Sequence, residues 1–110
     1  MKKVYNKLVR DKIPKIIESN GGLPTTKILN DKEYKEALEN KLFEEYNEVI
    51  KTTTSEKRIE ELADMLELIK SLALLENKNL DDVIKVAEEK RKKRGGFENK
   101  IYLKTVIEEK

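Results

Sequence analysis

The 110-residue chain contains no cysteine and no histidine, and each absence excludes a kind of chemistry. Without cysteine there is no disulfide framework and no thiol chemistry. Without histidine the chain lacks the usual general base near neutral pH and the commonest zinc ligand. Any acid–base chemistry must therefore use carboxylates, lysine, tyrosine or a water activated by a metal.

Long apolar runs and aromatic side chains are also scarce. No stretch approaches the roughly 20 apolar residues of a membrane-spanning helix. The first five residues, Met-Lys-Lys-Val-Tyr, lack the apolar run of a signal peptide, so we expect a cytoplasmic protein with no membrane partner. Aromatic residues make up 5% of the chain and the net charge is only +2, a combination that disfavours a nucleic-acid partner.

Charged residues, in contrast, are abundant, at 42% of the chain against 37% hydrophobic residues. The length suits one domain, which we expect to span residues 1–110. Residues 1–30 carry seven Lys/Arg and two Asp/Glu, whereas residues 31–70 carry seven Lys/Arg and twelve Asp/Glu. An acidic middle flanked by basic ends suits a metal ion together with a polyanionic substrate such as a nucleoside triphosphate.

The spacing of apolar residues predicts an all-α fold with two long helices, over residues 34–50 and 59–75. Asn30 and Glu33 have the spacing of a capping box for the first. The connection between the two helices is short, so we expect them to be antiparallel neighbours. The helix over 59–75 is apolar around so much of its surface that one partner cannot cover it. We therefore expect a homodimer, which could pair again into a tetramer.

Shorter elements are predicted at both ends of the chain. Asp11 is placed to cap a short helix that contains Pro14 in its first turn and ends at Gly21-Gly22. Asn79 is placed to cap a third long helix, which Gly95-Gly96 would stop. That helix has a packing stripe formed by Leu80, Val83, Ile84 and Ala87. Residues 101–103, Ile-Tyr-Leu, are predicted to form a short C-terminal strand.

Four carboxylates stand where the two long helices should be apolar. On a helical wheel Glu45 falls inside the apolar arc of the first helix, with Glu48 at its edge. Glu61 falls inside the arc of the second helix, with Asp64 at its margin. Carboxylates facing a core are costly unless they are paired or bind a cation. Packed face to face, the helices would bring all four together, and a hard divalent ion such as Mg²⁺, with Mn²⁺ as a substitute, would balance them. The alternative is a set of ordinary solvated charges in a highly charged chain.

Two basic clusters are candidates for binding phosphate. Lys7, Arg10 and Lys12 gather just before and at a helix N-terminus, where the positive helix end would assist. The alternative is a solvated basic arm. Arg91 and Arg94 continue the packing stripe of the third helix, and arginine suits fork-like contacts to phosphate or carboxylate. The alternative is that they pair with structural carboxylates or extend their charged ends into solvent.

Taken together, these residues resemble those of the all-α nucleoside triphosphate pyrophosphohydrolases. This group includes MazG, the dimeric dUTP/dCTP pyrophosphatases and phosphoribosyl-ATP pyrophosphohydrolase. The signature is Glu45-x-x-Glu48 followed by Glu61-x-x-Asp64. Residues 5–14 (Tyr-Asn-Lys-Leu-Val-Arg-Asp-Lys-Ile-Pro) are similar to the opening of small MazG-like, phosphoribosyl-ATP-pyrophosphohydrolase-like proteins. Residues 60–67 are similar to their second metal helix, and residues 90–97, ending in Arg-Gly-Gly-Phe, to their closing stretch.

The resemblance implies an antiparallel helical bundle of MazG-like type, completed by dimerisation, with Mg²⁺ held by the four carboxylates. It implies cleavage of a nucleoside triphosphate to the monophosphate and pyrophosphate. Glu45 is then the favoured general base as well as a member of the metal set with Glu48, Glu61 and Asp64, and these roles could be exchanged. Phosphate would be held by the five basic residues Lys7, Arg10, Lys12, Arg91 and Arg94.

The opening at residues 5–14 looks more like that of the separate MazG-like branch than that of phosphoribosyl-ATP pyrophosphohydrolases proper, and this resemblance implies a role in nucleotide-pool house-cleaning. Three alternatives stay open: phosphoribosyl-ATP hydrolysis in histidine synthesis, a non-catalytic helical dimer that acts as an interaction module, and a nucleic-acid-binding protein that uses the ends of the chain.

Overall fold

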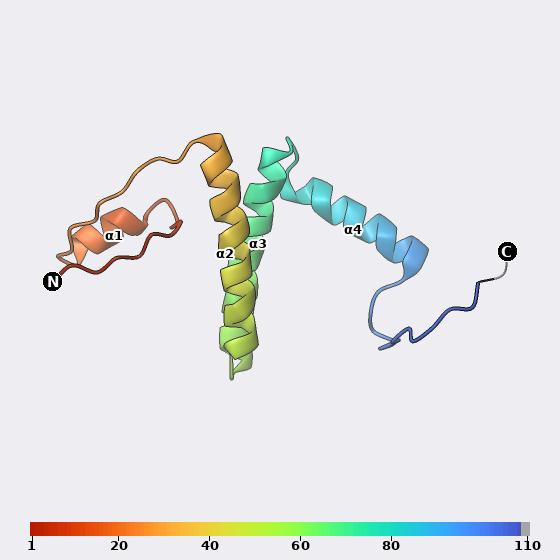
Figure 1. Cartoon of the computed structure of the whole chain (residues 1–110). Helices are drawn as coiled ribbons and strands as arrows, with labels where there is room; N and C mark the ends of the chain where they lie inside the picture. The colour runs from red at the N-terminus through yellow and green to blue at the C-terminus, as the bar shows by residue number, and fades with distance from the viewer. Residues whose placement is uncertain (109–110) are drawn as a thin grey trace. The chain divides into compact units, whose positions relative to one another are not determined.

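The computed structural model describes residues 1–108, and all regular secondary structure in this part of the chain is helical. The helices, in order, are α1 (Ile13–Ser19), α2 (Asp31–Lys51), α3 (Ser55–Leu75) and α4 (Leu80–Arg94) (Figure 1). The predicted all-α class is therefore confirmed. The predicted strand at residues 101–103 is wrong, because this segment has no strand assignment. A strand needs a hydrogen-bonded neighbour, and none of the other described segments is a strand that could supply one.

The two long helices begin at side-chain caps. The Asn30 side chain accepts a hydrogen bond from the Glu33 backbone N–H at 2.9 Å, and the Glu33 carboxylate accepts one from the Asn30 N–H at 3.2 Å. This is the predicted capping box, which fixes the start of α2. At the start of α3 the Thr54 hydroxyl accepts from the Lys57 N–H at 3.2 Å. Both helices therefore begin where the sequence satisfies backbone donors that would otherwise be unpaired.

The two shorter helices end just before glycines, as predicted, but the predicted cap at the start of α1 is wrong. Lys12, not Asp11, is the N-cap residue, and it makes no side-chain cap. Because the Ile13 N–H donates to the Arg10 carbonyl at 3.0 Å, the chain enters α1 through a turn that contains Asp11. Gly21 and Gly95 have positive φ values of 89° and 82°, which glycine adopts at little cost just beyond a helix end.

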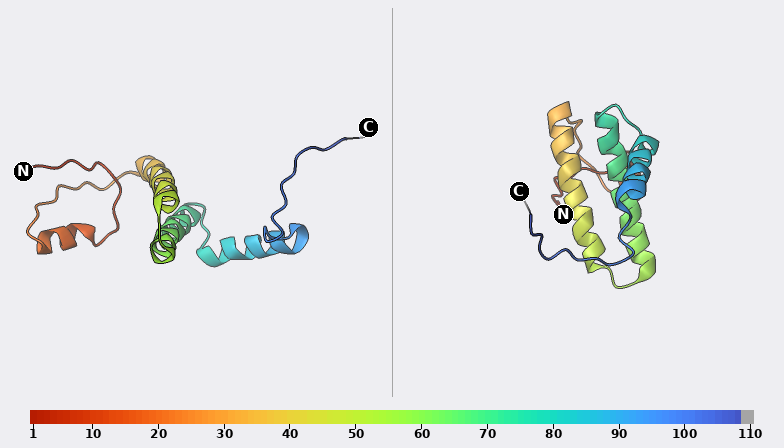
Figure 2. Two further views of the ribbon diagram at one scale, coloured as in Figure 1. Left: turned by 90° about the horizontal axis from the view of Figure 1, so that it is seen from below. Right: turned by 90° about the vertical axis from the view of Figure 1, so that its right-hand side faces the viewer.

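The helices α2 and α3 form an antiparallel hairpin and lie side by side in all three views (Figures 1 and 2). Each helix contributes one buried apolar side chain, Leu38 from α2 and Ala73 from α3. Several other large apolar side chains of the hairpin are exposed. They include Phe43, Tyr46 and Ile50 on α2, and Ile59, Leu62 and Leu66 on α3. Their i, i+3, i+7 spacing makes one exposed apolar stripe on each helix.

The described chain divides into two units, one up to Leu80 and one from Asp81 onward. The prediction of a single domain stays a prediction. In the second unit Arg91 pairs with Glu98, and Val83 and Ile84, from the predicted packing stripe, are exposed. Among residues 1–108, no helix has both the length and the apolar character needed to cross a membrane.

Candidate metal centre on the α2–α3 hairpin

Three of the four predicted carboxylates come together where α2 faces α3. Glu45 of α2, Glu61 and Asp64 of α3 each offer one carboxylate oxygen, and these oxygens all lie within 4.8 Å of one another. The i, i+3 spacing of Glu61 and Asp64 puts both on one face of α3. Glu48, one turn after Glu45, is exposed and lies outside this cluster.

Glu45 is the deepest member, with 9% of its surface exposed, as its position on the helical wheel predicted. Burial raises the pKa of the Glu45 carboxyl to about 7, and a hydrogen bond with Glu61 and the negative charge of Asp64 act in the same direction. The Lys41 ammonium, 3.7 Å from a Glu45 oxygen, opposes them and lowers the pKa. Without a cation, the cluster therefore resists carrying its full negative charge near neutral pH.

The donor set fits a hard divalent cation. Its ligand atoms are carboxylate oxygens, which suit Mg²⁺, Mn²⁺ and Ca²⁺. A chain without histidine or cysteine cannot supply the nitrogen and sulfur ligands that zinc sites usually contain. A bound cation would also remove the repulsion among Glu45, Glu61 and Asp64. Geometry and chemistry together make this cluster the best candidate for a metal centre in residues 1–108.

Two of the predicted phosphate-binding residues contact carboxylates of the hairpin, one of them inside the cluster and the other next to it. The Arg10 guanidinium donates a hydrogen bond from Nη2 to Asp64 Oδ1 at 2.7 Å. The Lys7 ammonium lies 3.6 Å from Glu44 Oε1. Both come from the irregular segment that precedes α1. Lys12 in the same segment is exposed at the N-cap of α1.

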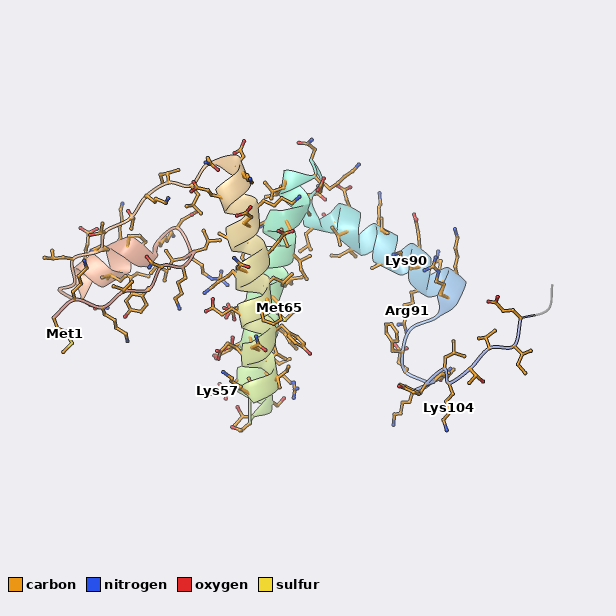
Figure 3. All side chains as sticks on the ribbon, in the orientation of Figure 1. Met1, Lys57, Met65, Lys90, Arg91 and Lys104 are labelled. Carbon is orange, nitrogen blue, oxygen red and sulfur yellow. The ribbon has the colours of Figure 1, made fainter. Side chains whose placement is uncertain are left out.

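Arg91 and Arg94 belong to the second unit, and Figure 3 labels Arg91 near the end of α4. The Arg91 guanidinium lies 2.6 Å from Glu98 Oε1, so Arg91 pairs with a carboxylate of its own unit. Pairing with a carboxylate is the predicted alternative to phosphate binding. Arg94 lines a cavity of about 330 Å³ formed by residues 94–101. The other predicted role for these two residues, phosphate binding, stays a prediction.

The sequence reasoning missed Lys41 and Glu44. The Lys41 ammonium lies 3.3 Å from Glu44 Oε1 in addition to its contact with Glu45. Spacings of i+3 and i+4 from a lysine to two glutamates on one helix are the signal that could have found it. Lys41 and Glu44 also line a cavity of about 190 Å³ between residues 6–8 and α2. Glu44 is half-buried, and its side chain borders this cavity and the Lys7 ammonium.

Comparison of the chain with models of known protein families, with curated proteins and with solved structures found no match. The resemblance to the pyrophosphohydrolases therefore depends on the motifs quoted above, and the site depends on its own geometry.

Proposed function

We propose that the protein is a Mg²⁺-dependent nucleoside triphosphate pyrophosphohydrolase with a house-cleaning role in the nucleotide pool. The observation that carries this proposal is the cluster of Glu45, Glu61 and Asp64 between two facing helices, with one member buried and Arg10 on another. The motif resemblance supports the reaction, which gives a nucleoside monophosphate and pyrophosphate. The basic residues beside the cluster support a substrate that carries several phosphates.

The roles of the residues follow from their positions. When bound, Mg²⁺ would neutralise phosphate oxygens and favour in-line displacement. Glu61 and Asp64 on α3 are half-buried and would hold the cation from one side. Glu45 is the deepest carboxylate and is the proposed general base, which takes a proton from the water that attacks the α-phosphorus. The bond from that phosphorus to the bridging oxygen breaks, and pyrophosphate leaves.

We assign Lys7 and Arg10 to the phosphate groups of the substrate, because both side chains are positively charged. Arg10 contacts Asp64 of the cluster, and Lys7 contacts Glu44, which precedes Glu45. Both side chains are therefore long enough to reach an anion bound at the cluster.

Lys12, from the same segment, is the third proposed phosphate-binding residue of this site. Phosphate binding by Arg91 and Arg94, which belong to the second unit, is a separate prediction. Glu48 stays the proposed fourth ligand, one helical turn from Glu45.

The protein is further proposed to act as a homodimer. The support is the pair of apolar stripes on α2 and α3, which are exposed in the single chain. Six large apolar side chains on one hairpin form a surface that soluble proteins usually cover. A second copy of the hairpin would bury both stripes at once.

Product analysis tests the proposed reaction. Purified protein with Mg²⁺ is incubated with ribo- and deoxyribonucleoside triphosphates and with phosphoribosyl-ATP, beside Glu45→Gln and the control Glu60→Gln. We expect a monophosphate and pyrophosphate from at least one triphosphate, no products with Glu45→Gln and unchanged turnover with Glu60→Gln. Turnover of phosphoribosyl-ATP alone would move the assignment to histidine synthesis. No turnover of any substrate by folded protein would favour the non-catalytic helical dimer.

A further inference from the structure

Arg10 connects the candidate metal centre to a distant part of the sequence. Its guanidinium donates to Asp64 Oδ1 at 2.7 Å, across 54 positions of the chain. Its own carbonyl accepts a hydrogen bond from the Ile13 N–H at 3.0 Å, so the main chain of Arg10 is tied to the start of α1. The contact is a charge-assisted hydrogen bond to one of the three clustered carboxylates.

The position of Arg10 differs from that of Lys41, the cation near Glu45. Lys41 lies on the same helix as Glu45, four residues earlier, and forms part of the hairpin itself. Arg10 comes from outside the hairpin and neutralises Asp64. A divalent cation bound by Asp64 would meet the positive charge of the guanidinium on the same carboxylate. Because two positive charges repel each other, the guanidinium and such a cation weaken each other's binding to Asp64.

The ion pair between Arg10 and Asp64 can be broken at little cost, because both side chains are exposed. The side chains of Arg10 and Asp64 are 59% and 40% exposed, and ion pairs with that much contact with water contribute little to stability. A guanidinium that leaves Asp64 keeps the planar fork of donors that matches a phosphate group. Lys7, three residues earlier, lies 3.6 Å from Glu44, so a second cation of this segment contacts the hairpin.

We propose that Arg10 is an exchangeable counter-ion of the metal centre. Before a divalent cation binds, Arg10 neutralises Asp64. The cation displaces the guanidinium from Asp64, and the freed guanidinium then holds a phosphate group of the substrate. This inference rests on the proposed function, because it needs Asp64 as a metal ligand.

Calorimetry separates the two halves of the exchange. Mg²⁺ is titrated into wild type, Arg10→Gln and Lys27→Gln, and pyrophosphate is then titrated into each protein at saturating Mg²⁺. Lys27 is the matched control, because it lies 3.3 Å from the exposed Glu33 carboxylate and its replacement removes the same charge. Arg10→Lys, which keeps the charge and loses the fork, is a second variant.

We expect Arg10→Gln to tighten Mg²⁺ binding about two- to fivefold, since an exposed competing ion pair is lost. We expect the same variant to weaken pyrophosphate binding about tenfold, because a charged donor to phosphate is lost. Lys27→Gln should change neither affinity. Arg10→Lys should leave Mg²⁺ binding near that of wild type and weaken pyrophosphate binding. General damage to the fold would not move the two affinities in opposite directions.

If wild type binds Mg²⁺ and Arg10→Gln binds it with equal or lower affinity, the exchange is wrong. The proposed metal centre is not contradicted by that result. Tighter Mg²⁺ binding with unchanged pyrophosphate binding would overturn the transfer of Arg10 to phosphate. No Mg²⁺ binding by wild type would overturn the metal centre and the exchange together.

Discussion

Glu45 is a carboxylate with little contact with water, and its ionisation must be linked to folding. Its pKa is raised to about 7 in the folded chain by burial first, then by Glu61 and Asp64. In the unfolded chain a glutamate titrates near its ordinary pKa of about 4.3. Between these two values the folded state binds more protons than the unfolded state, so stability falls as pH rises through this window.

The first prediction concerns this pH window in the absence of divalent cations. The free energy of unfolding of wild type, measured with urea and a chelator, should fall relative to that of Glu45→Gln between pH 5 and pH 7. The relative loss should be at most about 3 kcal/mol. If the difference between the two proteins were constant with pH, Glu45 would not be the linked group.

The second prediction separates Glu48 from the clustered carboxylates. Asp64 contributes an oxygen to the cluster, whereas Glu48 is exposed outside it. Asp64→Asn should therefore weaken Mg²⁺ binding more than Glu48→Gln does, as measured by calorimetry at one pH. Equal losses would show that Glu48 is a full ligand, as the motif resemblance implies.

Single-residue features were predictable from sequence where they depend on one helix. The wheel gave the burial of Glu45, because the direction of a side chain on a helix is set by the helical repeat. It could not give the contact between Arg10 and Asp64, since nothing in either local sequence specifies a partner 54 positions away. Nor could it show that Glu48 would lie apart from the other three carboxylates.

At the scale of the helices, the beginning of α2 depends on one reciprocal pair of hydrogen bonds, between Asn30 and Glu33. We predict that Asn30→Ala lowers the free energy of unfolding by about 1 kcal/mol, because an N–H in the first turn loses its acceptor. Mg²⁺ affinity should stay unchanged, because Asn30 is not among the carboxylates of the cluster. Urea unfolding and calorimetry test the two parts. A large loss of Mg²⁺ binding would show that the start of α2 positions the cluster.

Helix ends were predictable because caps and glycines act locally. The capping box and the positive φ angles at Gly21 and Gly95 lie where the sequence placed them. The strand at residues 101–103 was wrong because a strand depends on a partner that local sequence does not name. Asp11 was wrong as a cap because a turn and a cap use the same residue types, and the turn formed at that position.

At the scale of the whole molecule, the exposed stripes on α2 and α3 lead to a prediction about assembly. Wild type should sediment as a dimer, and its unfolding midpoint should rise with protein concentration. Leu66→Glu, on the exposed stripe of α3, should shift the equilibrium to the monomer. The control Lys57→Gln, which changes the net charge by the same amount at an exposed position of α3 outside the stripe, should stay dimeric. A monomeric wild type would contradict the proposed assembly.

The proposed function depends most on Glu45, Glu61 and Asp64 forming a divalent-cation centre. Thermal unfolding of wild type, Glu61→Gln and the control Glu60→Gln, each with and without Mg²⁺, tests it directly. A ligand that binds only the folded state raises its stability, so Mg²⁺ should raise the melting temperature of wild type and Glu60→Gln by several degrees. Glu61→Gln should lose most of this shift. No shift in wild type, or the same shift in all three proteins, would contradict the claim.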